Sequence, residues 1–228
     1  MKDLSYLEKL SIENLLPELV TVFDDKIAFS TSFSIEDQLI THFIFSQNLP
    51  IRVFTLDTGR LYEETYDVLN RTRNKYDKKI EVFFPEKNDV EKLIFKKGPN
   101  SFFESIENRI ECCNIRKVLP LNRALENVDC WITGIRAAHS ENRKNSSIIE
   151  FDTKRNIQKI NPLFNWTYDE VRKKIDEYKI PYNLLQDKGF YSIGCAPCTR
   201  ALREGEDTRA GRWWWEQSDK KECGLHTT

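Results

Sequence analysis

Short apolar runs alternate along the chain with stretches of helical apolar spacing, and this alternation restricts the possible fold more than any other feature. A repeated order of strand and helix predicts parallel strands that are joined by crossover helices in one open sheet. Strands are expected at residues 26–29, 51–56, 80–84 and 130–133, with a hairpin formed by 148–151 and 158–160. Helices are expected at residues 35–45, 62–76, 88–96, 101–108, 115–125 and 167–178. We therefore expect an α/β fold with a twisted, mostly parallel sheet that is flanked by helices.

Length and charge are consistent with one domain and give no sign of a polyanionic partner. The 228 residues can bury one core, and 35 Lys and Arg nearly balance 36 Asp and Glu. Nucleic acid and membrane partners are therefore not expected. Residues 1–10 lack the apolar block of a secretory signal, and no run has membrane-spanning length, so we expect a cytoplasmic protein. We expect a helical segment at 1–25, one α/β domain at 26–215 and a mobile tail at 216–228.

Small polar residues follow the first two expected strands. Residues 30–34 read Ser-Thr-Ser-Phe-Ser, and residues 57–60 read Asp-Thr-Gly-Arg. Backbone N–H groups at a helix N-terminus bind phosphate or sulfate, and ligands of open α/β sheets bind beyond the carboxyl ends of the strands. A serine-capped helix and an ordinary turn are the structural alternatives. The first turn lacks the glycines and the Lys-Ser/Thr pair of a P-loop NTPase, so that class is disfavoured.

Four of the six cysteines are arranged as an adjacent pair, Cys112-Cys113, and a CxxC pair, Cys195 and Cys198. In a cytosolic chain of this size, such pairs favour metal or redox chemistry over disulfides. Side chains of adjacent residues diverge, so both cysteines of the first pair can reach one centre if the backbone bends there or if the centre is larger than one ion. Four thiolates suit zinc or an iron–sulfur cluster, and ligand type alone does not decide. Cys130 lies inside an expected strand and is interpreted as a core residue.

Several features cluster near the C-terminal end of the sequence. Cys223 lies between Lys221 and His226, and a thiol beside cations is a candidate nucleophile with a lowered pKa. Arg209 and Arg212 would share one face of a helix, an arrangement that suits a divalent anion. The run Trp213-Trp214-Trp215 indicates partial burial, with stacking on a base as the alternative.

Taken together, these segments resemble the assimilatory sulfonucleotide reductases, specifically the iron–sulfur adenosine 5′-phosphosulfate (APS) reductases. The resemblance extends from about Lys26 onward, and Ser34 and Ile35 stand where the commoner family form has Gly-Ala. The segments that carry it are residues 32–37 (SFSIED), 56–62 (LDTGRLY), 111–117 (ECCNIRK), 131–136 (WITGIR), 193–200 (IGCAPCTR), 205–215 and 221–226 (KECGLH).

The resemblance implies an adenine-nucleotide α-hydrolase-like (PP-loop, Rossmann-like) fold and assigns roles to individual residues. Cys223 would be catalytic, and one 4Fe–4S cluster would be held by Cys112, Cys113, Cys195 and Cys198. Lys117 would place positive charge between the cluster and the substrate. The residues implied in substrate binding are Ser30, Ser32, Phe33, Leu56, Asp57, Thr58, Gly59, Lys117, Gly134, Arg136, Arg209, Arg212 and His226.

The implied activity is reduction of APS to sulfite and AMP through an S-sulfonate on Cys223, in sulfate assimilation for cysteine biosynthesis. Thioredoxin or a glutaredoxin-like dithiol would be the reductant, a homo-oligomer is expected, and the 3′-phosphorylated nucleotide (PAPS) stays open as a second substrate. An ATP-pyrophosphatase-type tRNA sulfur transferase on the same fold is the alternative enzyme, but it should show an SGGxDS loop and a basic face, and the sequence has neither. A non-catalytic, zinc-stabilised nucleotide-binding module would give no reason for the ECGLH tail.

Overall fold

The computed structural model describes residues 4–137, 147–216 and 224–225. In this part of the chain, one sheet has the strand order β3-β2-β1-β4-β6-β5. All neighbouring strands are parallel except β5, which is antiparallel to β6. The strands are β1 (Ile27–Ser30), β2 (Arg52–Leu56), β3 (Glu81–Phe83), β4 (Cys130–Ile132), β5 (Ile149–Asp152) and β6 (Ile157–Ile160).

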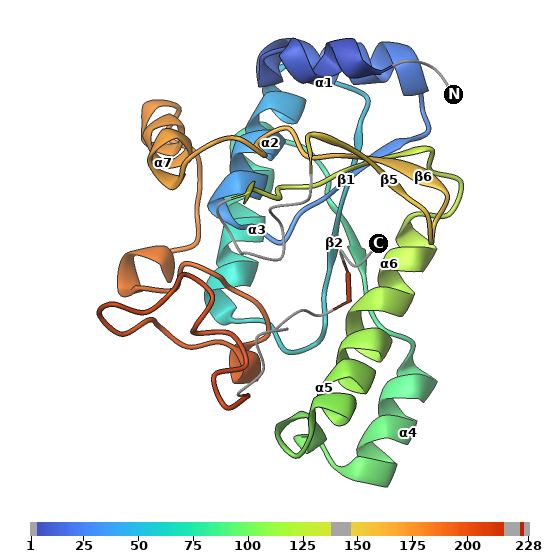
Figure 1. Cartoon of the computed structure of the whole chain (residues 1–228), viewed down its shortest axis with the longest axis vertical. Helices are drawn as coiled ribbons and strands as arrows, with labels where there is room; N and C mark the ends of the chain where they lie inside the picture. Colours follow the sequence, from blue (N-terminus) through green and yellow to red (C-terminus); the bar gives the residue numbers. More distant parts are fainter. Residues whose placement is uncertain (1–3, 138–146, 217–223, 226–228) are drawn as a thin grey trace.

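Helices cover both faces of this sheet (Figure 1). The α-helices are α1 (Ile12–Phe23), α2 (Ile35–Ser46), α3 (Glu63–Tyr76), α4 (Lys87–Lys97), α5 (Ile106–Cys113), α6 (Leu119–Ala124) and α7 (Tyr168–Glu177). The shorter helical segments are η1 (Ser5–Lys9), η2 (Ser101–Phe103), η3 (Asn114–Val118), η6 (Gln186–Lys188) and η7 (Ala196–Cys198). No helix in the described part of the chain has the length and apolar character needed to cross a membrane.

The core lies on both sides of the sheet because side chains of a strand alternate between its faces. In β4, Cys130 and Ile132 pack into the larger core cluster, which includes residues of α1, α2 and α7, whereas Trp131 packs into the second cluster with Leu121 of α6. Burial on both faces is typical of parallel strands between helices. The prediction of an α/β fold with a mostly parallel sheet is therefore confirmed, as is the burial of Cys130.

Most expected helices and strands agree with the structure to within two residues, and the expected hairpin is present. The expected helix at 101–108 is wrong in its bounds, because a 3₁₀ turn occupies 101–103 and α5 continues to Cys113. The expected helix at 115–125 begins instead as the π-helix η3, and π-helical turns are frequent at functional sites. The cysteine pair therefore ends an α-helix immediately before a wider helical turn.

The helical segment before the sheet belongs to the same core. It comprises η1 and α1, whose buried Leu7, Leu15, Leu16 and Leu19 all join the larger cluster. Figure 1 shows α1 lying across one end of the molecule, next to α2.

Candidate active site and cysteine cavity

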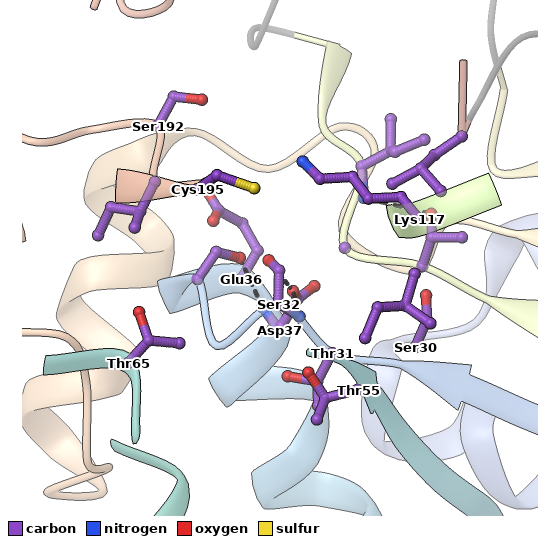
Figure 2. Close-up of a pocket in the computed structure, with 18 of the residues that line it drawn as sticks. Ser30, Thr31, Ser32, Glu36, Asp37, Thr55, Thr65, Lys117, Ser192 and Cys195 are labelled. Atoms are coloured by element: carbon purple, nitrogen blue, oxygen red, sulfur yellow. Dashed lines mark hydrogen bonds between the residues drawn. The ribbon is translucent and has the colours of Figure 1, made fainter. Parts of the chain in front are cut away.

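A cavity of about 220 Å³ opens at the carboxyl ends of β1, β2 and β4. Its wall contains Ser30 and the turn after β1, then Thr55, Leu56 and Thr58 at the end of β2, and Thr133 to Ile135 after β4. Lys117, Cys195, Arg209 and Arg212 close it from other segments, and Figure 2 shows the Lys117 amine and the Cys195 sulfur pointing into it from different sides. This position agrees with the rule that ligands of open α/β sheets bind beyond the carboxyl ends of the strands. Hydroxyl groups and cations around one cavity suit a nucleotide with an anionic group.

The turn after β1 is held by Asp37, a residue that the sequence reasoning did not select. The Asp37 carboxylate accepts hydrogen bonds from the backbone N–H and the hydroxyl of Ser32, each at 2.6 Å. Ser34 caps α2, because its hydroxyl accepts from the Asp37 N–H at 3.2 Å, and its φ of −63° requires no glycine. Phe33 has a positive φ of 60° and a side chain that is buried in the core rather than lining the cavity. The turn is therefore organised partly by its own carboxylate.

Replacing Asp37 by asparagine should remove a pH dependence from the stability of the protein. Burial raises the pKa of Asp37 from 3.8 to about 6, although the hydrogen bonds from Ser32 oppose the rise. The folded state then holds a proton that the unfolded state has lost, so the free energy of unfolding should fall as the pH rises from about 4 to about 6. At about 1.4 kcal/mol per pKa unit, the fall approaches about 3 kcal/mol. Urea denaturation of wild type and Asp37→Asn across this range measures it.

The matched control is Asp25→Asn, because Asp25 is exposed. Subtracting a variant curve from the wild-type curve cancels pH effects from the rest of the protein. The slope due to Asp37 should appear in the difference between wild type and Asp37→Asn and be absent from the difference between wild type and Asp25→Asn. An Asp37→Asn curve parallel to wild type would show that Asp37 has an ordinary pKa.

The segment after β2 forms a tight turn at the cavity edge. Leu56 and Thr58 line the cavity, whereas the Asp57 carboxylate accepts from the Gly59 N–H at 2.7 Å and from the Tyr66 hydroxyl at 3.0 Å. Gly59 has a φ of +70°, where a side chain would be strained. Asp57 and Gly59 therefore shape the turn from behind, and Leu56 and Thr58 form its cavity face.

The basic residues expected around the substrate lie at two depths. Lys117, Arg209 and Arg212 line the cavity, but the last two lie on a turn and an isolated bridge, not on one face of a helix. Arg136 is buried behind Glu36, to which its Nε donates at 2.8 Å. Glu36, rather than Arg136, lines the cavity. Direct contact between Arg136 and a substrate stays a prediction.

The four paired cysteines meet in a second, smaller cavity. Cys112, Cys113, Cys195 and Cys198 all line it, together with Arg60, Phe102, Arg109, Arg116, Lys117, Pro197 and Trp213. Within the described residues, no three or more His, Cys, Asp or Glu side chains form a group that could hold one metal ion. Four thiols around one cavity are nevertheless the donor set that iron–sulfur clusters require. The Trp213 side chain also lines this cavity, and its buried N–H has no hydrogen-bond partner in the described structure.

Positive charge surrounds the cysteine cavity. Burial alone would raise the pKa of the Cys195 thiol, but Lys117, the Thr58 hydroxyl and two arginines outweigh it and lower that pKa. The guanidinium groups of Arg109 and Arg212 each lie 4.7 Å from the ring centroid of Trp213, and Arg109 is also paired with the buried Glu216. These cations favour the thiolate of Cys195, whereas burial raises the pKa of the Cys112 and Cys198 thiols.

Sequence reasoning missed several lining residues, notably Asp37, Trp131 and the segment 191–194. Trp131 is buried, and its N–H donates to the Ser30 hydroxyl at 2.9 Å, which leaves the Ser30 O–H able to donate into the cavity. In sequence it reads as an ordinary apolar residue of a strand. Segment 191–194 precedes the CxxC pair, and its last two residues belong to the motif 193–200 that carries the resemblance, which was the available signal for it.

The tail approaches the cavity through its two described residues. Leu225 lines the cavity and packs against the cluster that contains Phe54 and Leu121. Gly224 has a φ of +80° and approaches Val118. Cys223 and His226, on which two of the site predictions fall, lie outside the described residues, as does most of the tail that is expected to be mobile.

Comparisons with known proteins agree with this arrangement. The phosphoadenosine phosphosulfate reductase domain matches residues 26–201. The adenosine 5′-phosphosulfate reductase of Burkholderia cepacia is 48% identical over 204 residues, which cover 90% of this chain and 82% of that protein. The protein of the same name from Allochromatium vinosum is 45% identical, covering 89% and 79% respectively.

Solved structures show the same relationship in three dimensions. The phosphoadenylyl-sulfate reductase of Candida auris, in a phosphate complex, superposes with a TM-score of 0.74 at 28% identity and covers 86% of this chain and 93% of that chain. The FMN adenylyltransferase of Candida glabrata reaches 0.57 at 13% identity, covering 98% and 82%, and shares the fold alone. The chain therefore belongs to the phosphoadenosine phosphosulfate reductase family and, within it, groups with the adenosine 5′-phosphosulfate reductases.

Proposed function

We propose that this protein reduces APS to sulfite and AMP in assimilatory sulfate reduction, with thioredoxin or a glutaredoxin-like dithiol as reductant. The observation that carries the proposal is the juxtaposition of two cavities. One lies at the strand ends and is lined by hydroxyl groups and cations, and the other contains the four paired cysteines. The names of the relatives support the same substrate.

The substrate would lie across the ends of β1, β2 and β4. Ser30, Ser32 and Thr58 offer hydroxyl groups to the nucleotide, and Lys117, Arg209 and Arg212 offer positive charge to its phosphosulfate. Each well-placed donor of this kind is typically worth about 3–4 kcal/mol to a transition state. The remaining proposed substrate-binding residues are Leu56, Asp57, Gly59, Gly134, Phe33, Arg136 and His226.

In the first step, the Cys223 thiolate attacks the sulfate sulfur of APS. A sulfur–sulfur bond forms, the bond from that sulfur to the phosphate oxygen breaks, and AMP leaves with the electron pair of that bond. Thiolate and substrate are both anionic, so cations must offset their repulsion. The position of Leu225 in the cavity wall, two residues after Cys223 in sequence, supports this role for the tail.

In the second step, a dithiol thiolate attacks the Cys223 sulfur of the S-sulfonate. Sulfite leaves with the electron pair of the sulfur–sulfur bond, and a mixed disulfide remains. The second thiol of the donor then displaces Cys223, so the donor is oxidised to a disulfide and supplies both electrons. The identity of the donor and a homo-oligomeric, cytoplasmic state stay predictions.

We further propose that Cys112, Cys113, Cys195 and Cys198 hold a 4Fe–4S cluster. The α-helix that carries the first pair directs its two thiols about 100° apart, so a centre with several metal atoms suits them better than a single zinc ion. Such a centre would supply a fixed anionic metal–sulfur group that joins the two cysteine segments.

The test combines colour with product formation. Protein purified without oxygen should be brown, with broad visible absorbance and bound iron and sulfide. With thioredoxin it should release sulfite from APS, and the same assay with PAPS measures the preference between the two nucleotides. Colourless, zinc-containing protein would contradict the cluster. Absence of sulfite release from either nucleotide would contradict the activity, and sulfur transfer to tRNA would favour the alternative enzyme.

A further inference from the structure

The two cavities share part of their walls. Lys117, Cys195 and Trp213 line both of them. A ligand in one cavity therefore touches side chains that also border the other. Shared side chains alone do not couple two sites, because coupling needs a segment whose position both ligands favour.

Residues 57–62 form such a segment, since Thr58 and Leu61 line the strand-end cavity and other members are bonded to the CxxC segment. The Ala196 N–H donates to the Arg60 carbonyl at 2.8 Å. The Tyr62 hydroxyl donates toward the Thr199 carbonyl at 2.7 Å, with the Ala196 carbonyl at 3.2 Å. Thr58 and Cys195 approach through oxygen and sulfur at 3.2 Å. The turn after β2 is thus joined to the second cysteine pair at three points.

The same segment is also bonded to the helix that follows the first cysteine pair. Arg116 lies in the π-helix directly after Cys113, and its Nη1 donates to the Thr58 carbonyl at 2.7 Å. Its Nε is buried and has no hydrogen-bond partner in the described structure, and its side chain lines the cysteine cavity. One short turn therefore contacts the elements that carry both pairs of cysteines.

We infer that residues 57–62 couple nucleotide binding to retention of the metal centre, with Tyr62 and Arg116 as positioning residues. The inference rests on the proposed function, because it takes a nucleotide in the first cavity and a cluster on the four cysteines. A bound nucleotide fixes the turn, the turn holds the two cysteine segments in place, and the cluster is released more slowly. Reciprocity of binding free energies requires that the cluster strengthen nucleotide binding by the same factor as the nucleotide strengthens cluster binding.

The experiment measures cluster loss from the intact enzyme. Visible absorbance is followed after addition of an iron chelator, with and without saturating AMP, and AMP binding to the cluster-loaded protein is measured by calorimetry. AMP should slow bleaching of the wild type by a factor of about 5 to 150, the usual range for coupled sites. Tyr62→Phe, which removes one hydroxyl, should reduce this protection factor about fivefold.

Tyr66→Phe is the matched control, because the Tyr66 hydroxyl donates to Asp57 of the same turn and, in the described part of the chain, to no residue of the two cysteine segments. It should leave the protection factor unchanged, even if AMP affinity falls. Arg116→Lys keeps the charge but shortens the reach to Thr58, and it should also reduce protection. This variant tests the inference if Tyr62→Phe yields no loaded protein.

The outcomes separate the inference from the proposed function. If the protein contains no cluster or does not bind AMP, the proposed function fails. If it does both and AMP gives no protection, the coupling is absent. If Tyr62→Phe and Arg116→Lys accelerate bleaching equally with and without AMP, their roles are merely structural and the inference is overturned.

Discussion

Replacing Cys223 by serine should reduce sulfite release from APS by about a thousandfold or more, the scale seen when a catalytic nucleophile is removed. A serine hydroxyl is far less ionised than a thiol at neutral pH, so it attacks the sulfate sulfur poorly. A sulfate ester of serine would also offer no sulfur–sulfur bond to a dithiol. AMP affinity should persist, because the groups that line the strand-end cavity are unchanged. Sulfite release and AMP calorimetry measure the two effects.

Mass spectrometry after incubation with APS alone gives the direct readout. Wild type should carry an added SO₃ group on Cys223, and Cys223→Ser should carry none. Cys130→Ala is the matched control, since Cys130 is fully buried in the core, where burial raises its pKa strongly. Its S-sulfonate should still form on Cys223. An adduct on another residue, or sustained turnover by the serine variant, would exclude the proposed mechanism.

The sheet could be predicted because its pattern is local. Residues 27–29 and 130–132 are apolar throughout, and the structure buries alternate members in different clusters on the two faces. The π-helical turn that follows the first cysteine pair could not be predicted in the same way. This turn, at 114–118, buries Arg116 and Lys117, and their partners there, the Thr58 carbonyl and the Cys195 thiol, are remote in sequence.

Site residues could likewise be predicted from the sequence where the signal was local, and could not where it depended on residues remote in sequence. Ser30, Ser32 and Thr58 could be selected because they follow apolar runs, and all three line the cavity. The place of Asp37 and of Arg136 relative to the cavity could not be read from the sequence, because it depends on partners that fold beside them. Asp37 faces Ser32 at the turn, and Arg136 is held behind the cavity by Glu36.

Gly194→Ala should lower kcat/KM about 100-fold, because the added methyl group would occupy the position of the Arg212 guanidinium. A Cβ at residue 194 would lie 2.5 Å from Arg212 Cζ and 2.8 Å from Nη1, closer than real contacts allow. Residue 194 does not have the positive φ that would itself strain alanine. Arg212 is buried at the wall of the strand-end cavity, so its displacement removes a cation from the proposed phosphosulfate site. Loss of one such donor typically costs about 10²–10³ in rate.

A double-mutant cycle identifies the cause. Arg212→Met should show a loss similar to that of Gly194→Ala, and the double variant should be about as impaired as either single variant, because both remove the same interaction. Visible absorbance of all three proteins controls for loss of the cluster, since Gly194 adjoins Cys195. Losses that multiply in the double variant would show that Gly194 acts independently of Arg212, through the cysteine segment itself. Wild-type kcat/KM in Gly194→Ala would show that Arg212 can move aside and still serve the substrate, and the position of its guanidinium would then not limit the reaction.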